Sequence, residues 1–220
     1  MKVSLLQTEE LILIGSGGHA AVVAEVIFQQ EQRNRIVAIS TLDDISERNI
    51  FDGISIIKED ELIFNYDTET TLLINGVGSI PGKTIRNILY HEFINRGFRF
   101  YSVLSPHAII SPFSSLGSGV QIMAGAIIQH GAVIGDNCII NSGAIVEHDC
   151  VIGAHSHIAP GATLSGGVVT GKCVHIGTNA TVIQNIHIGE GAVLGAGTTI
   201  TRDIEKDTIV YPAKTFSRGL

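Results

Sequence analysis

A six-residue repeat dominates the second half of this 220-residue sequence. An aliphatic side chain recurs at every sixth position, with Thr170 as the one exception, and no insertion breaks the register. The series is Ile110, Leu116, Ile122, Ile128, Ile134, Ile140, Val146, Ile152, Ile158, Leu164, Thr170, Ile176, Val182, Ile188, Leu194 and Ile200. A period of six does not fit a helix, but it is a multiple of the two-residue strand period and is typical of β-solenoids. The repeat therefore predicts a left-handed parallel β-helix in which three hexapeptides close one coil, a handedness that departs from the usual crossover rule.

The residues around each aliphatic position support a tightly coiled chain. Small residues stand four places after it, at Ala126, Ala132, Cys138, Ala144, Cys150, Ala162, Ala180 and Ala192. Such positions are expected to face the crowded interior, which would make Cys138 and Cys150 poor nucleophiles. Glycine stands directly after the aliphatic residue at 117, 135, 153, 171, 177, 189 and 195. We expect the chain to bend at these glycines, where a missing Cβ lowers the steric cost.

Charge and composition exclude several classes of protein. The net charge is −7 and the pI is about 5.7, which argues against nucleic acid or an acidic membrane surface as the main partner. No apolar run is long enough to span a membrane, and Met1 to Glu10 lacks the apolar core of a signal peptide. The three cysteines have neither disulfide-like nor CxxC spacing. We therefore expect a reduced, cytoplasmic protein.

The first half alternates strand and helix patterns. We expect strands over residues 11–14, 36–39, 71–74 and 98–103, and helices over residues 20–32 and 83–96. Strands that alternate with helices, and that end in glycine-rich loops, predict a small doubly wound α/β unit of the Rossmann-like kind. The sequence thus divides into an α/β domain at 1–105 and a β-helix domain with a C-terminal tail at 106–220.

Two loops at predicted strand ends could bind a nucleotide. The segment Gly15–Ala20 fits G-x-G-x-x-A, and glycines between a strand and a helix let the backbone approach a phosphate. A tight turn without a ligand is the alternative. Asp43 and Asp44 follow the second strand, where carboxylates could accept hydrogen bonds from a ribose or a base. Their alternative is a solvated turn or a helix N-cap.

The histidines of the repeat region are the next candidates. His148 follows Val146 by two places and should point outward, with Glu147 and Asp149 on either side. One of these acids could orient the imidazole and stabilise its protonated form, as a general base requires. His157 should also point outward, one coil below His175. The alternative for any outward histidine on a solenoid is a solvated surface residue.

Four segments of the sequence form a recognisable set: IGSGGHAAVVAEVI near the start, the LDD turn, IINSGAIVEHDCVIGAHSHIAPGATLSGGV, and LGAGTTITRDI. Together they resemble the bacterial NeuD/PglD-like nucleotide-sugar acetyltransferases, of the bacillosamine and perosamine type. The resemblance covers nearly the whole chain, and the His-acid-Cys centre with a second histidine nine residues later is its most specific part. The tail departs from it: the family often has Gly-Val-Pro-Ala-Lys where this chain has Val210-Tyr-Pro-Ala-Lys214, so a pantetheine contact at that glycine does not carry over.

The resemblance implies a role for individual residues. It places the general base on His148 and the acid that raises its basicity on Asp149. It places acetyl-CoA contacts on His157, Thr178 and Ala196. It places nucleotide-sugar contacts on Gly17, Gly18, His19, Asp43, Asp44, Gly78 and Asn141. No metal is implied.

The implied reaction is direct acetyl transfer from acetyl-CoA to the amino group of a UDP-, GDP- or dTDP-linked 4-amino-deoxysugar, in polysaccharide or glycan biosynthesis. No acyl-enzyme is needed, and the family assembles as a homotrimer with active sites between subunits. The nearest alternative is O-acetylation of sialic acid or another sugar hydroxyl, which would use the same base. A γ-class carbonic anhydrase shares the solenoid but lacks the α/β domain, and an NAD-binding sensor is favoured only by the glycine motif.

Overall fold

The computed structural model describes residues 9–58 and 60–212, apart from the side chains of residues 60 and 61. They form two compact units. The first holds the chain up to Pro106 together with Ser118–Gln121, and the second holds His107–Gly117 and the chain from Ile122 onward.

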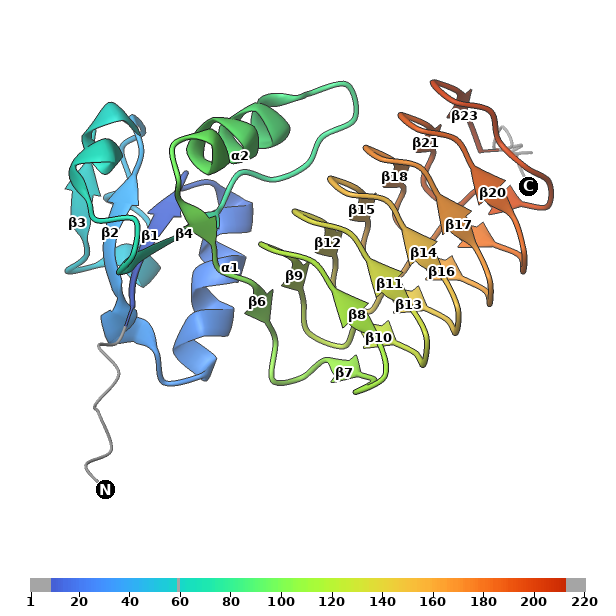
Figure 1. The fold of residues 1–220 in the computed structure, drawn as a ribbon, viewed down its shortest axis with the longest axis horizontal. Helices are drawn as coiled ribbons and strands as arrows, with labels where there is room; N and C mark the ends of the chain where they lie inside the picture. Colours follow the sequence, from blue (N-terminus) through green and yellow to red (C-terminus); the bar gives the residue numbers. More distant parts are fainter. Residues whose placement is uncertain (1–8, 59, 213–220) are drawn as a thin grey trace, which may run out of the picture. The chain divides into compact units, whose positions relative to one another are not determined.

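The first unit is built on a five-stranded parallel sheet with the order β3-β2-β1-β4-β5 (Figure 1). Its strands are β1 Glu10–Ile14, β2 Ile36–Ser40, β3 Ser55–Ile57, β4 Thr71–Asn75 and β5 Arg99–Phe100. Its helices are α1 Gly18–Gln29 and α2 Ile85–Asn95, with short 3-10 helices η1 Arg33–Arg35, η2 Asn49–Phe51 and η3 Asp60–Asn65. The chain runs outward from β1 to β3 and then returns to place β4 beside β1. The strand order therefore reverses between β1 and β4, which is where doubly wound sheets bind ligands.

The predicted α/β pattern is confirmed, with two differences. β3 was not predicted, because it has only three residues, of which Ser55 and Ile56 are exposed. The strand expected over residues 98–103 is divided: β5 joins the sheet, whereas β6 (Val103–Leu104) does not. The central strands β1 and β4 are buried almost completely, as their unbroken apolar runs indicate.

The second unit is a coil of two-residue strands stacked in parallel sheets, and the predicted left-handed β-helix is confirmed (Figure 1). The strands are β7 Ile109–Ile110, β8 Ser115–Leu116, β9 Gln121–Ile122, β10 Ile127–Ile128, β11 Val133–Ile134, β12 Ile139–Ile140, β13 Ile145–Val146, β14 Val151–Ile152, β15 His157–Ile158, β16 Thr163–Leu164, β17 Val169–Thr170, β18 His175–Ile176, β19 Thr181–Val182, β20 His187–Ile188, β21 Val193–Leu194, β22 Thr199–Ile200 and β23 Ile209–Val210. The first face has the order β22-β19-β16-β13-β10-β7, the second β20-β17-β14-β11-β8, and the third includes β23-β21-β18-β15-β12-β9. Strand partners lie 18 residues apart, as in Ile128 with Val146.

The repeated aliphatic residues form the interior of this coil. From Ile122 to Ile200 each of them is at most 5% exposed, and the small residues four places later are fully buried. The exception, Thr170, is also buried, and its hydroxyl oxygen accepts a hydrogen bond of 3.0 Å from the backbone N–H of Gly153. A buried hydroxyl is tolerated there because it has this partner.

The bend of each coil lies two residues later than the sequence analysis placed it. Left-handed φ angles fall three places after the aliphatic residue, and the residues with them in the coils include Gly125, Gly131, Gly143, Gly161, Gly167, Asn137, Asp149, His155, Cys173, Asn179 and Asn185. The glycines directly after the aliphatic residue serve close packing instead. A Cβ at Gly177, for example, would lie 2.5 Å from the carbonyl oxygen of Leu194 in the next coil.

The register shortens at the last coil. Ile188 pairs with Ile204 and Leu194 pairs with Val210, 16 residues apart in each case. Val210 belongs to β23, and Tyr211 after it is 77% exposed. Ala213 and Lys214 of the divergent tail lie outside the described residues.

Candidate active site

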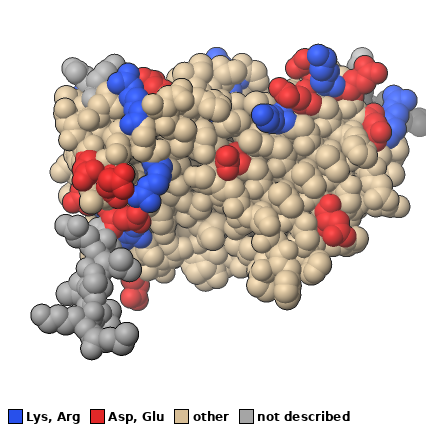
Figure 2. Space-filling model, in the orientation of Figure 1, with Lys and Arg blue, Asp and Glu red and all other residues tan. Residues whose placement is uncertain are grey.

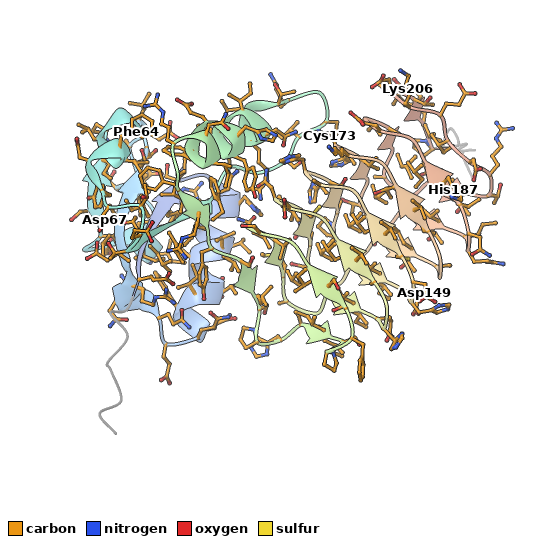
Figure 3. All side chains as sticks on the ribbon, in the orientation of Figure 1. Phe64, Asp67, Asp149, Cys173, His187 and Lys206 are labelled. Atoms are coloured by element: carbon orange, nitrogen blue, oxygen red, sulfur yellow. The ribbon has the colours of Figure 1, made fainter. Side chains whose placement is uncertain are left out.

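His148 and Asp149 form a pair at the corner between the first and second faces. Nδ1 of His148 lies 2.8 Å from Oδ2 of Asp149, and the two side chains are 63% and 67% exposed. Asp149 lies at the edge of the coil stack (Figure 3). The other candidate acid, Glu147, contacts only the backbone N–H of His148, at 3.4 Å. Asp149 is therefore the acid that orients the ring.

This contact fixes what each ring nitrogen of His148 can do. An ionised carboxylate only accepts hydrogen bonds, so Nδ1 must carry the hydrogen. In the neutral ring, Nε2 then has the lone pair, and a proton taken up there leaves an imidazolium beside the Asp149 carboxylate. That is the arrangement of a general base with an orienting acid.

A second histidine site lies on the third face. Oδ1 of Asn141 accepts the backbone N–H of Ser142 at 2.8 Å, so its Nδ2 faces Nε2 of His157, 3.1 Å away. An amide nitrogen only donates, so Nε2 of His157 accepts and its ring is neutral with the hydrogen on Nδ1. The ring of His157 also lies edge-on to that of His175, with 4.9 Å between centroids. Burial lowers the pKa of His175.

His157 is less accessible than the sequence analysis expected. It lies on the outer side of β15 as predicted, but only 8% of it is exposed. Single-residue periodicity gives the side from which a residue projects but not what covers it. Its contacts with Asn141 and His175 come from the neighbouring coils.

The remaining candidates of the coil gather away from His148. Asn141, Thr178 and Ala196 all lie in the corner that joins the third face to the first, with Thr178 two turns beyond Asn141 and Ala196 one turn beyond Thr178. The backbone of this corner is regular, and the N–H of Gly197 donates to the carbonyl of Thr178 at 2.8 Å. His148 lies at the next corner, across the width of the first face, and Asn141 contacts His157 instead of His148.

In the α/β unit, the glycine loop leads into α1. Gly15 has a left-handed φ of 89°, and Gly17 is the N-cap residue of the helix. A Cβ at Gly17 or Gly18 would meet no atom within 4 Å, so packing within the chain does not require glycine there. The space beside these two residues adjoins the unpaired N–H groups of the first helical turn. A negatively charged group could approach the backbone closely at this point.

A cavity of about 610 Å³ opens at the carboxyl ends of the strands. Its lining residues are Ile14, Gly15, Ser40, Thr41, Leu42, Asp43, Lys58, Val77, Ile85 and Leu89. Asp43 and Lys58 supply opposite charges, and Leu42, Val77, Ile85 and Leu89 supply apolar surface. A planar group with polar edges would suit this lining.

The two aspartates of this loop have different roles. Asp43 lines the cavity, and its backbone N–H donates to Thr41 Oγ1 at 3.1 Å. Oδ1 of Asp44 accepts the backbone N–H of Ser46 at 3.0 Å. That hydrogen bond holds the pKa of the Asp44 carboxyl below its ordinary value. Asp44 thus stabilises a turn, which is one of the alternative roles that the sequence analysis gave for this residue.

His19 is held by a buried chain of hydrogen bonds. Nε2 of Gln121 donates to the carbonyl of Asn75 at 2.7 Å, which turns Oε1 of Gln121 toward Nε2 of His19, also 2.7 Å away. His19 therefore donates through Nε2. Burial, with a smaller effect of the Arg86 charge, lowers the pKa of His19 to about 4, although the bond to Gln121 opposes this shift. The ring is neutral at pH 7, and Gly78 packs beside it.

Several residues of this region were not predicted. Arg86 is 3% exposed, and its Nη1 donates to the carbonyl groups of Asn75 and Val77 at 2.8 and 2.6 Å. At the end of β4, packing requires a glycine at Gly76, because a Cβ there would lie 2.7 Å from the carbonyl oxygen of Ile14. Gln121 is 102 residues from His19. Of these residues, only Gly76 lies in a glycine-rich loop that the local sequence reveals. No periodicity in the sequence connects Gln121 with His19.

Within residues 9–58 and 60–212, no group of three His, Cys, Asp or Glu side chains could hold a metal ion. No helix in that same part of the chain is long and apolar enough to cross a membrane. Cys138 and Cys150 are buried as predicted, and burial raises the pKa of the Cys150 thiol, so it is a poor nucleophile.

Both the α/β unit and the β-helix match known protein families. The PglD N-terminal domain matches residues 10–93, the bacterial transferase hexapeptide (six repeats) matches 113–148 and 131–166, and the hexapeptide repeat of succinyl-transferase matches 167–202. The fold, the coil and these matches define a hexapeptide-repeat acetyltransferase. No curated protein matches the chain by sequence comparison.

Solved structures narrow the class. The acetyltransferase domain of PglB from Neisseria gonorrhoeae FA1090, solved with acetyl coenzyme A, is 33% identical with a TM-score of 0.80, over 95% of this chain and 100% of that one. PerB from Caulobacter crescentus, solved with CoA and GDP-perosamine, is 31% identical with a TM-score of 0.79, over 91% and 92%. This chain belongs to the NeuD/PglD-like acetyltransferase family. WeeI from Acinetobacter baumannii AYE, 21% identical, shows the same fold.

Proposed function

We propose that this enzyme transfers the acetyl group of acetyl-CoA to the amino group of a nucleotide-linked 4-amino-deoxysugar. The observation that carries the proposal is the 2.8 Å contact between Nδ1 of His148 and Oδ2 of Asp149 on an exposed corner of the coil. It leaves Nε2 of a neutral imidazole able to take a proton from an incoming amine. PerB, a relative of 31% identity, was solved with CoA and GDP-perosamine, which supports the class of both substrates.

His148 acts as the general base. Its Nε2 accepts the proton that the sugar amine loses as the amine nitrogen bonds to the thioester carbonyl carbon, and the imidazolium forms beside the Asp149 carboxylate. The C–S bond of the thioester then breaks, and CoA leaves as a thiolate that can be reprotonated. The buried thiols of Cys138 and Cys150 donate to backbone carbonyls at 3.2 Å, which argues against an acyl-enzyme at either of these two cysteines.

Acetyl-CoA supplies an acetyl group activated as a thioester. His157, Thr178 and Ala196 are proposed to hold it, along the third face and the corner that follows it. The bond from Asn141 keeps the His157 ring neutral and fixes its orientation on the third face. Asn141 then acts beside the acetyl donor as well as near the acceptor sugar.

The nucleotide part of the acceptor is proposed to bind the α/β unit. Gly17 and Gly18 leave space for phosphates at the start of α1, and Asp43 and Lys58 line the cavity at the strand ends, which Gly15 of the same loop also lines. Gly78 and the neutral ring of His19 are proposed to complete this site. Asp44, which holds a turn, would act by shaping the loop of Asp43.

The proposed enzyme is a homotrimer with active sites between subunits. His148 and the group around Thr178 lie at different corners of the β-helix. An active site that uses both is therefore completed most simply by a second copy of the chain. The region between residues 107 and 200 has only five charged side chains: Asp136, Glu147, Asp149, Lys172 and Glu190. Figure 2 shows few Lys, Arg, Asp or Glu side chains over the middle coils. Such surfaces suit subunit contacts.

Subunit mixing tests the shared site. A His148→Ala chain and a His157→Ala chain, each nearly inactive alone, should regain activity when they are unfolded and refolded together. Light scattering should show three chains in each particle. No regain in mixed trimers would contradict a site between subunits, and a fully active monomer would contradict the trimer.

A thiol-release assay tests the reaction. The protein and acetyl-CoA are offered UDP-, GDP- and dTDP-linked 4-amino-deoxysugars and free sialic acid. We expect CoA release with at least one amino sugar, and mass spectrometry should place the acetyl group on nitrogen. Activity on sialic acid alone would replace the proposal with O-acetylation. We also propose a cytoplasmic location, which the spacing of the three cysteines supports, since it is neither disulfide-like nor CxxC.

A further inference from the structure

The imidazole of His148 occupies the space that a side chain at position 166 would fill. A Cβ built on Gly166 would lie 2.5 Å from both Cε1 and Nε2 of His148, and 3.1 Å from Cδ2. These separations are far below van der Waals contact. The ring can therefore keep its observed position only if residue 166 has no side chain.

The register of the coil explains this proximity. His148 and Gly166 are 18 residues apart, so they stand at the same corner in successive turns. The N–H of Gly167 donates to the carbonyl of His148 at 2.9 Å, which joins the two turns at this point. The relation between Gly166 and the ring is thus set by the coil backbone.

The backbone itself does not demand glycine at position 166. The neighbouring Gly167 has a left-handed φ of 70° and accounts for the bend, whereas no left-handed φ occurs at Gly166. Position 166 is the second after the repeated aliphatic residue. The equivalent positions are Pro112, Ser118, Ala124, His130, Asp136, Ser142, His148, Ala154, Pro160, Lys172, Thr178, Gln184, Glu190, Ala196 and Arg202. Fifteen of the sixteen such positions have a side chain, so the corner geometry accepts one.

We infer that Gly166 is a positioning residue for the general base: its missing side chain seats the His148 imidazole against the next coil while Asp149 holds Nδ1. This inference rests on the proposed role of His148. The ring is exposed, and a single contact with an exposed carboxylate would leave it free to rotate. The backbone surface at Gly166 supplies a second restraint on the ring, beside its Cε1 and Nε2 atoms.

Gly166→Ala tests this inference. The added methyl group should push the ring outward and away from Asp149, and because an exposed side chain can move, the fold should tolerate the change. We expect kcat to fall about 10- to 100-fold, the scale for a misplaced catalytic group, with little change in the KM for acetyl-CoA. The melting temperature should change by no more than about 2 °C. Gln184→Ala, at the same corner one turn further on, is the matched control and should keep wild-type kcat.

A double-mutant cycle separates positioning from a general defect. In a His148→Ala background, adding Gly166→Ala should cause no further loss of the residual rate, because there is no ring to displace. An equal loss in both backgrounds, or wild-type kcat in Gly166→Ala, would overturn the inference. Crystal structures of the wild type and Gly166→Ala give a readout without activity: the variant ring should lie beyond 3.5 Å from Asp149, and an unmoved ring would overturn the inference. If wild-type enzyme acetylates none of the tested sugars, the proposed function fails while this structural test still stands.

Discussion

The coil and the α/β unit hold their candidate histidines in opposite ways. His148 lies on an exposed corner with a carboxylate on Nδ1, whereas His19 lies in a largely buried network with an amide on Nε2. The carboxylate can accept a hydrogen bond from the His148 ring whether that ring is neutral or charged, whereas burial lowers the pKa of His19 to about 4 and keeps it neutral. The surroundings thus suit one imidazole to take up a proton and the other only to donate or accept a hydrogen bond.

The largest test of this contrast is His148→Ala. Loss of a positioned base should lower kcat by about 100-fold or more, with little change in the melting temperature. His187 provides a matched control, since it is an exposed histidine of the same coil, 67% exposed, with Nδ1 3.9 Å from Asp203 Oδ1. His187→Ala should leave kcat unchanged. Similar losses in the two variants, measured by thiol release, would show that His148 is only one more surface histidine.

The second test concerns His19 and the pH dependence of stability. Its folded-state pKa of about 4 lies below the unfolded value of 6.5, so the unfolded chain binds the proton first as the pH falls. The contribution of the neutral, buried His19 ring to the free energy of unfolding is therefore fully present above pH 6.5 and is lost as the pH falls toward 4. Between pH 7 and pH 5 this group should cost about 2 kcal/mol in the free energy of unfolding.

Urea denaturation at a series of pH values measures this effect. His19→Gln keeps a donor for Gln121 but has no group that titrates, so its stability should depend less on pH by about that amount. Identical pH profiles for the wild type and His19→Gln would show that burial does not control the protonation of His19.

The smallest of these effects is expected for Asp149→Asn. Asp149 has a left-handed φ of 59°, and the same turn position is occupied by Asn137, Asn179 and Asn185 in other coils. Asparagine therefore suits the backbone, and the change isolates the negative charge. We expect kcat to fall about tenfold while the melting temperature stays the same. An unchanged kcat would assign Asp149 to the turn alone.

The coil could be predicted almost completely, because a fixed period states which residues lie above one another. This period alone predicts the interior position of Cys150 and the outward position of His148. It misplaced the bend, since glycine is needed at one position for close packing and at another for φ, and composition alone does not separate the two. Asparagine and aspartate at the left-handed positions were the signal that could have located the bend.

The α/β unit was predicted in outline, but its contacts were not. Strand and helix patterns are local, whereas Gln121 reaches His19 and Asn75 from far along the sequence. The short strand β3 has too few buried residues to produce a pattern. Asp43 and Asp44 are adjacent in the sequence, yet Asp43 lines the cavity and Asp44 holds a turn. Only the conformation of the surrounding loop decides which of the two residues lines the cavity.

The 18-residue pairing also limits how the length of this chain can change. A duplicated coil would leave every later side chain at its own corner and simply add about 4.8 Å of height. An insertion of six residues would instead turn everything beyond it by about a third of a revolution, and Thr178 would move to a different corner from Asn141. Insertions within the stack are therefore neutral only in whole turns. The two-residue deletion before Ile204 lies after the last of the proposed catalytic and binding residues, where rotating the rest of the coil separates nothing.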